Sequence, residues 1–173
     1  LITQCYCQWE VINTFEQKAI QKLNFINEDL GYAMANDLSV NKKIIIKTKD
    51  GGNSWDTIPN ISYGEFSEFM DICFIKDSVG FTVFRDYNNA SAPMRIHKTF
   101  NDGINWEDIT PDSTNIGMGY SVMQFLDENI GFWGVAHMLY KTTDGGNSWD
   151  TTMLNNVSVM SLDFINADTG VIG

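Results

Sequence analysis

Side chains that could carry out catalysis or hold a metal are few and widely spaced in this sequence. The two histidines, His97 and His137, have no cysteine or second histidine at the spacing of a metal-binding motif. We interpret both as structural residues, and we predict no metal site and no cofactor. Cys73 lies in an alternating apolar segment, where a buried, inert thiol is a better interpretation than a nucleophile.

Carboxylates, in contrast, are abundant. The chain has 22 Asp and Glu against 11 Lys and Arg, which gives a formal net charge of −11. This balance argues against nucleic acid or an anionic membrane surface as a partner, and no apolar run is long enough to predict a transmembrane segment. A hydrolase with paired carboxylates stays open, because the required separation of about 5 to 9.5 Å cannot be read from sequence.

The strongest pattern is an eight-residue segment that occurs three times. Residues 48–55 (TKDGGNSW) and 142–149 (TTDGGNSW) are nearly identical, and residues 99–106 (TFNDGINW) are a looser copy. We call them the first, second and third box in chain order. Glycine supplies positive φ, and Thr and Asp oxygens can accept hydrogen bonds from the N–H groups of a turn, so each box is predicted to be a hairpin turn. The residues assigned to this structural role are Thr48, Asp50, Gly52, Trp55, Thr99, Asn101, Gly103, Trp106, Thr142, Asp144, Gly146 and Trp149.

A second pattern keeps the same phase as the boxes. Four marker phenylalanines, Phe25, Phe74, Phe125 and Phe164, each begin a segment that reads aromatic, aliphatic, polar turn and glycine. Apolar residues alternate upstream of each marker, which predicts a strand. The repeat of roughly 40 to 50 residues fits a four-stranded propeller blade. In the first repeat, a strand ends at Phe25, the next two span 32–35 and 44–47, and the last begins at Trp55.

The boxes resemble the Asp-box, the bacterial neuraminidase repeat of pattern Ser/Thr-x-Asp-x-Gly-x-Thr/Ser/Asn-Trp. Together with the Gly-Tyr/Phe markers, they resemble propellers related to the photosystem II stability and assembly factor, within the sialidase superfamily. The three boxes and four markers span nearly the whole chain, and the second box departs from the pattern with Asn101 in place of Asp. The resemblance implies an all-β propeller of four-stranded antiparallel blades. It leaves function open, because such propellers include sialidases, xyloglucan hydrolases, sorting receptors and non-enzymatic assembly factors.

The repeats predict a partial propeller of about three and a half blades over residues 8–173. We expect a strand from the ring-closing last blade at 8–14, blades at 18–60, 66–111 and 119–154, and the start of a fourth at 157–173. Incomplete first and last units predict that the polypeptide self-associates through open blade edges. Residues 1–7 have the character of a signal-peptide remnant, with small residues Cys5 and Cys7 before a cleavage site, which predicts a secreted, periplasmic or cell-surface protein.

Ligand-binding residues are expected on the rim opposite the boxes, because long loops on a rigid scaffold are where function concentrates. Two segments there, 85–93 and 63–69, are long and varied. The candidates are Tyr63, Glu65, Arg85, Asp86 and Tyr87. The alternative is that these segments are solvated connectors with no ligand.

Three functional classes follow from the resemblance. Arg85 and Arg95 are the only arginines, whereas the sialidase site needs three, and His97 stands where the Arg-Ile-Pro segment of sialidases has proline. We therefore predict a non-catalytic exported scaffold that binds a protein or glycan partner. A glycoside hydrolase with catalytic residues in missing blades is the alternative. A photosystem assembly factor in the strict sense is the third, disfavoured because that role implies a basic, arginine-rich surface.

Overall fold

The computed structural model describes residues 11, 14–58, 67–86, 94–111, 119–155 and 157–173. Within these residues the chain forms strands and turns and no helix. The predicted all-β class is confirmed. The predicted strand at residues 8–14 lies mostly outside the described residues.

The strands form three four-stranded antiparallel sheets and one two-stranded sheet, each built from consecutive strands. Blade one comprises β1 (Lys18–Phe25), β2 (Gly31–Asp37), β3 (Lys42–Thr48) and β4 (Asp56–Thr57). Blade two comprises β5 (Ser67–Lys76), β6 (Val79–Asp86), β7 (Arg95–Thr99) and β8 (Glu107–Asp108). Blade three comprises β9 (Ser121–Phe125), β10 (Gly131–Val135), β11 (Met138–Thr142) and β12 (Asp150–Met153). The two-stranded sheet, which we call blade four, comprises β13 (Leu162–Asn166) and β14 (Thr169–Ile172).

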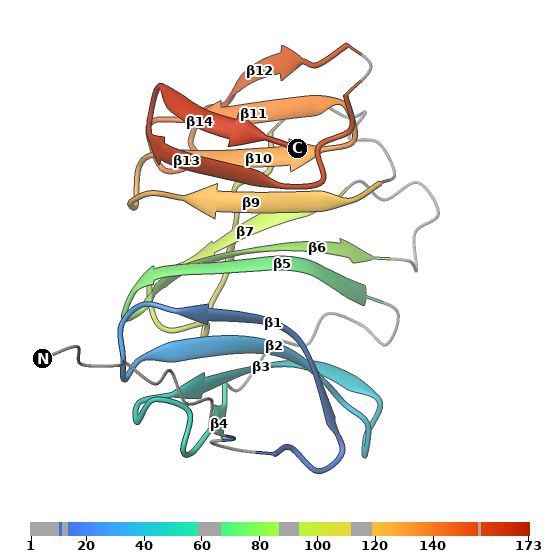
Figure 1. Ribbon diagram of the computed structural model, residues 1–173, viewed down its shortest axis with the longest axis vertical. Coiled ribbons are helices and arrows are strands. Elements are labelled where there is room, and N and C mark those ends of the chain that lie inside the picture. The colour runs from blue at the N-terminus through green and yellow to red at the C-terminus, as the bar shows by residue number, and fades with distance from the viewer. Residues whose placement is uncertain (1–10, 12–13, 59–66, 87–93, 112–118, 156) are drawn as a thin grey trace, which may run out of the picture.

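The blades stack face to face in chain order, with the first strands β1, β5, β9 and β13 in contact from one blade to the next (Figure 1). This arrangement is a partial β-propeller, as predicted. The outermost strands begin one residue later than expected, at Asp56 rather than at Trp55, because the tryptophan is still part of the turn.

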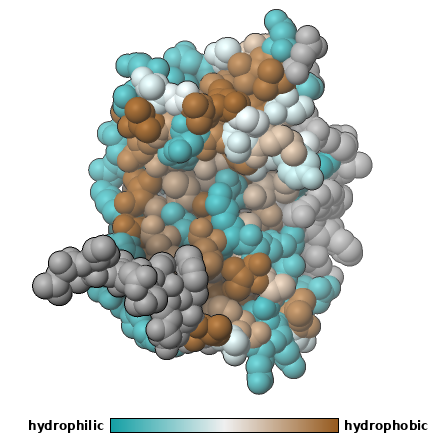
Figure 2. Space-filling model, in the orientation of Figure 1, coloured by the Kyte–Doolittle hydropathy of each residue, from teal (hydrophilic) through white to brown (hydrophobic). Residues whose placement is uncertain are grey.

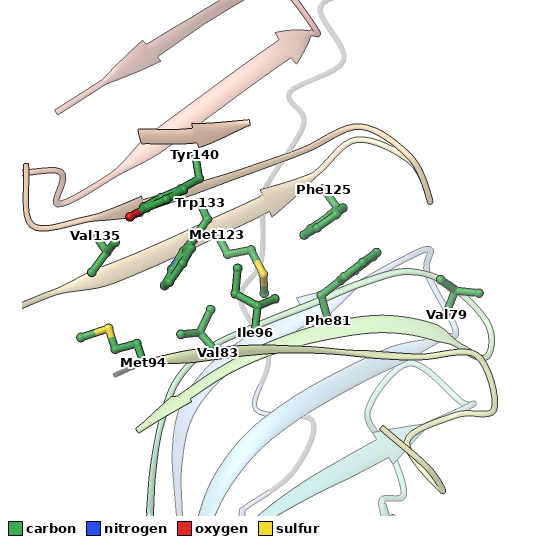
Figure 3. Close-up of a cluster of buried hydrophobic side chains, with 10 residues drawn as sticks. All are labelled: Val79, Phe81, Val83, Met94, Ile96, Met123, Phe125, Trp133, Val135 and Tyr140. Carbon is green, nitrogen blue, oxygen red and sulfur yellow. The ribbon is translucent and has the colours of Figure 1, made fainter. Parts of the chain in front are cut away.

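Hydrophobic side chains fill the space between neighbouring blades. Figure 3 shows the cluster between blades two and three, where Phe81 and Phe125 face each other and Trp133 lies beside Met123. A second cluster, which includes Tyr32, Ile45 and Phe74, lies between blades one and two. The second strand of each complete blade is covered on both faces, so β2 and β10 are almost wholly buried. The core is therefore a series of interblade layers, each completed only when two repeats meet.

Candidate functional site

Each box is a hairpin turn that its own side chains hold closed. In the first box, the Thr48 hydroxyl accepts hydrogen bonds from the N–H groups of Gly52 at 2.9 Å and Asp50 at 3.3 Å. The Asp50 carboxylate accepts from the Ser54 N–H at 2.8 Å and the Ser54 hydroxyl at 2.6 Å. Both glycines have positive φ, 67° at Gly51 and 96° at Gly52, which disfavours other residue types.

The third box repeats this geometry almost bond for bond. The Thr142 hydroxyl accepts from Gly146 N–H at 2.9 Å, and Asp144 accepts from both donors of Ser148. In both of these boxes the serine hydroxyl, the serine N–H and the threonine hydroxyl stabilise the ionised carboxylate, which lowers the pKa of Asp50 and of Asp144 to about 2.

The second box closes without a carboxylate. The Asn101 side-chain oxygen accepts from the Asn105 N–H at 2.9 Å, and the Thr99 hydroxyl accepts from the Gly103 N–H at 2.9 Å. The amide thus takes the backbone-binding role of the aspartate. Because it carries no charge, this turn does not depend on pH in the way that the other two do.

The boxes also connect neighbouring blades. At the junctions between complete blades, the isoleucine three residues after the box tryptophan reaches the glycine at the fifth position of the next box: Ile58 packs on Gly103, and Ile109 packs on Gly146. A Cβ atom added at Gly146 would lie 2.5 Å from the Ile109 Cδ1 atom. The Trp149 indole N–H crosses the same junction and donates to the Ile109 carbonyl at 2.9 Å, whereas Trp106 donates within its own turn, to Gly103.

Stacked aromatic rings form a second, regular interblade contact. In each complete blade, the aromatic residue that follows the glycine at the start of the second strand stacks on the marker phenylalanine of the next blade. The pairs are Tyr32 on Phe74 at 3.6 Å, Phe81 on Phe125 at 3.4 Å and Phe132 on Phe164 at 3.6 Å between ring centroids. Within each of the three complete blades, the marker ring meets the box tryptophan edge-on, as Phe74 meets Trp106 at 6.3 Å.

A lysine lies beside each of these stacks, directly before the box threonine. Lys47, Lys98 and Lys141 pair across the strands with Tyr32, Phe81 and Phe132, respectively. Each ammonium lies over its aromatic partner, at 5.2, 5.2 and 6.0 Å from the ring centroid, which is within cation–π range. Each also reaches across to the next blade, so the lysine is a junction residue.

The two buried junction lysines have different partners. Lys47 donates to Asp77 at 2.6 Å and to Asp102 at 2.7 Å; burial lowers its pKa, but these carboxylates outweigh burial and raise it overall. Lys98 donates instead to backbone carbonyls, those of Glu128 at 3.0 Å and Gly145 at 3.2 Å. Burial therefore lowers the pKa of Lys98.

Asp71 is a buried carboxylate that connects three blades along their innermost strands. It accepts from Lys22 of blade one, from the Ile72 N–H at 2.7 Å and from the Met123 N–H of blade three at 2.7 Å. Burial raises the pKa of Asp71 despite the lysine. Its oxygens are occupied by these donors, which is the arrangement expected of a structural carboxylate.

The position before each marker phenylalanine makes a further link between blades. The Gln124 side chain accepts from the Phe164 N–H at 2.7 Å, and Asn24 makes the same bond to Phe74 N–H. At the middle junction the residue is Cys73, whose Sγ lies 3.9 Å from the Phe125 carbonyl oxygen. Burial raises the pKa of this thiol, which disfavours the thiolate.

Sequence reasoning assigned the box residues but missed the junction residues. The signal for the lysines was present, since a lysine directly precedes the threonine of each box, at 47–48, 98–99 and 141–142. The signal for Ile58 and Ile109 was their fixed spacing from the box tryptophan. Asp71 had no counterpart in the other repeats, so no repeat comparison could have found it.

The predicted binding residues are only partly described. Arg85 lies near the end of β6, where its backbone pairs with Glu68, and Asp86 ends that strand opposite Ser67. Tyr63, Glu65 and Tyr87 lie outside the described residues. The backbones of Arg85 and Asp86 thus lie at the end of β6, on the rim opposite the boxes, and a binding role for all five residues stays a prediction.

The described residues contain no group of three or more His, Cys, Asp or Glu side chains that could hold a metal ion. His97 is packed edge-on against Phe84 at 4.5 Å, and burial lowers its pKa to about 4. The exposed His137 ring nitrogen Nδ1 lies 2.9 Å from the Val157 carbonyl oxygen. No helix in the described part of the chain could span a membrane.

Repeated four-stranded sheets, box turns and shared junction contacts define the class as a β-propeller of the bacterial neuraminidase repeat type. The model of one family, the photosynthesis system II assembly factor YCF48, matches residues 2–171, and the chain belongs to that family.

Two solved structures are similar to the chain. The structure of YCF48 bound to a D1 peptide has a TM-score of 0.58 at 20% identity, over 78% of this chain and 40% of that one. A GH74 enzyme of Niastella koreensis has a TM-score of 0.56 at 17% identity, over 84% of this chain and 24% of that one. Both show the fold, and the chain spans less than half the length of either. No curated protein matches the sequence significantly.

Proposed function

We propose that this chain is part of a non-catalytic propeller scaffold that binds a segment of a protein partner. The observation that carries the proposal is that the charged side chains best placed for chemistry make structural contacts instead. Lys47 and Asp71 join blades, and Asp50 and Asp144 close turns. Groups engaged in this way hold a frame rigid, and a rigid frame positions loops for binding.

The family supports a protein partner over a glycan. In the similar structure, YCF48 is bound to a D1 peptide. The likeness to the GH74 enzyme is one of fold only. We place the partner on the rim opposite the boxes, with Arg85 and Asp86 as described members and Tyr63, Glu65 and Tyr87 as further ones. We also propose an exported location, on the cell surface, in the periplasm or secreted.

Peptide titration tests the proposal, with the D1 peptide of the YCF48 complex as the first probe and unrelated peptides of equal charge as controls. The two arginines offer a matched pair. We expect Arg85→Gln to weaken peptide binding about tenfold. Arg95 forms an ion pair with Asp108 within its own blade, so we expect Arg95→Gln to leave peptide binding unchanged. Binding that is indifferent to both changes would refute the assignment of this rim.

An activity assay addresses the alternative. The chain is expected not to hydrolyse fluorogenic sialosides or xyloglucan oligosaccharides. Turnover above a buffer blank that is lost on mutation of a carboxylate would overturn the scaffold proposal in favour of a glycoside hydrolase.

A further inference from the structure

The second box differs from its sister boxes in the side chains at its tip. Where the first and third boxes have Lys49 and Thr143, the second has Phe100, and where they have Asn53 and Asn147 it has Ile104. Phe100 and Ile104 are 52% and 50% exposed. Two large apolar side chains therefore stand on a turn whose counterparts are polar.

Ile104 costs the turn a hydrogen bond. In the sister boxes the asparagine side chain donates to the aspartate backbone carbonyl, Asn53 to Asp50 at 2.7 Å and Asn147 to Asp144 at 2.6 Å. Isoleucine has no donor, so this bond cannot form in the second box. An exposed isoleucine in place of a turn-stabilising asparagine is not explained by stability.

Phe100 has a partial structural role. The Lys98 ammonium lies 4.7 Å from the centre of its ring, a cation–π contact on one side. About half of the residue is still exposed. The contact fixes the ring at the surface, which makes it a pre-ordered anchor and lowers the entropy lost on binding.

The charge around this tip is negative. Glu107, Glu128 and Asp144 lie close enough to Lys98 to influence its ionisation, and Asp77 and Asp102 lie across the neighbouring junction, around Lys47. Among the lysines of this region, Lys47 and Lys98 are buried, Lys76 is paired with Glu128, and the exposed Lys49 lies near Asp77, so that four lysines face these five carboxylates. An approaching segment therefore meets two apolar side chains surrounded by an excess of carboxylates.

We propose that Phe100 and Ile104 form a docking site for a protein segment in which apolar side chains are flanked by lysine or arginine. Apolar anchors inside a charged rim are the usual anatomy of a protein-binding surface, and the carboxylates select the sign of the partner's flanks. The site lies on the box rim, opposite Arg85 and Asp86. It rests on the proposed function only in that the partner is a protein.

The test uses the whole chain and a synthetic peptide with two leucines flanked on both sides by lysines in a Gly/Ser background. Methyl NMR of the isoleucine side chains reports weak binding at a known position. We expect the Ile104 methyl signals to shift on titration, with an affinity that falls as salt rises. A peptide with glutamate in place of lysine, and one with serine in place of leucine, should cause no shift.

The decisive variant copies the third box. Phe100→Thr with Ile104→Asn introduces the residues of a turn that this chain already forms, so it should fold and should melt no lower than the wild type. We expect it to weaken peptide binding about tenfold, measured by fluorescence polarisation. Leu38→Ser with Val40→Asn removes two exposed aliphatic side chains from the β2–β3 turn and should leave binding unchanged.

Three outcomes would overturn the inference: equal binding by wild type and box variant, no shift at Ile104, or an Ile104 shift that appears with protein concentration alone, which would indicate a second copy as occupant. Suppose that Arg85→Gln abolishes D1-peptide binding while the leucine and lysine peptide causes no shift of the Ile104 signals. This inference is then overturned, and the proposed function stands.

Discussion

The carboxylates of the boxes act as substitutes for backbone groups. Asp50 accepts from a serine N–H and a serine hydroxyl at once, and Asn101 takes the N–H bond with an uncharged oxygen. The chain thus contains two turns closed by a carboxylate and one turn of the same shape closed by an uncharged amide. This internal comparison separates the effect of charge from the effect of geometry.

Acid should destabilise the fold through the charged turns. The folded-state pKa of Asp50 and of Asp144 is about 2, below the ordinary value of 3.8. A lowered carboxyl pKa contributes stability above the ordinary value, and that contribution is lost as the pH falls from about 4 to about 2. We expect the melting temperature to fall over this range, measured by differential scanning fluorimetry.

The Asp50→Asn, Asp144→Asn double variant should show a flatter profile between pH 4 and 2, because all three boxes then have an uncharged amide at the third position. His97 must be separated from this effect. Burial lowers its pKa from 6.5 to about 4. The unfolded chain therefore binds a proton at this residue before the folded chain does, which destabilises the fold as the pH falls from 6.5 to 4. An unchanged acid profile below pH 4 in the double variant would contradict the role given to the carboxylates.

Lys47 and Lys98 should respond differently to removal of their charge. Lys47→Met leaves Asp77 and Asp102 without their shared ammonium and should lower the free energy of unfolding by about 1 to 3 kcal/mol. Lys98→Met breaks bonds to carbonyl groups only and keeps contact with the Phe81 ring, so it should cost less. Urea unfolding of both variants measures the difference; a larger loss for Lys98→Met would show that the carboxylates do not strengthen the first junction.

For single residues, the sequence predicted the contacts made within one turn and missed the contacts made between blades. Box residues act within eight positions of each other, so their pattern shows in any one repeat. Lys47 and Asp102 lie 55 positions apart, and their contact exists only once two blades have stacked. A repeat pattern fixes which residues are equivalent, but not which equivalent residues meet.

At the scale of elements, the box tryptophans support the strands that follow them. Trp149 packs against the cluster between blades two and three and crosses the junction with its indole N–H. Trp149→Ala should lower the free energy of unfolding by about 3 kcal/mol, the lower end for an aromatic truncation because the ring is only partly buried. Thermal unfolding monitored by circular dichroism measures the change.

His137→Ala is the matched comparison for that experiment. Its ring is exposed and its Nδ1 atom contacts the Val157 carbonyl, so the expected loss is below about 1 kcal/mol. Equal shifts for the two variants would show that the tryptophan is not an interblade support.

Strand order and blade period followed from the sequence because the alternation and the turns are both local signals. The innermost strand was harder. The alternation at 70–74 predicted a simple strand, but β5 is irregular between Phe69 and Asp71, where it turns a carboxylate into the space between blades. Such a departure depends on the neighbouring strands, which the local pattern does not contain.

At the scale of the whole molecule, equivalent positions differ in exposure between blades. Ile72 and Phe74 of blade two are 1% and 2% exposed, but Leu23 and Phe25, their equivalents in blade one, are 54% and 44% exposed. At the other end of the stack, Val171 is 69% exposed, although its equivalent Phe132 is buried. The surface view shows hydrophobic side chains in separate groups toward both ends of the stack (Figure 2).

We therefore predict that the 173-residue polypeptide, on its own, self-associates. In blade four, β14 pairs only with β13 among the described strands, so its other edge is open. Open strand edges and exposed aliphatic faces both favour association. Size-exclusion chromatography with light scattering over a range of concentrations should show dimers or larger species, and Leu23→Ser should reduce them. A monodisperse monomer at every concentration would contradict the prediction.

The stacking of each second-strand ring on the next marker phenylalanine has a consequence for how such a chain can lengthen. Every complete repeat carries one half of a junction on one face, as Phe81 and Lys98 do, and the other half on the opposite face, as Phe74 does. A gene duplication that copies one repeat therefore copies both halves together. The new unit then fits its neighbours without further change, and its turn tips are free to differ, as the tip of the second box differs from those of the other two.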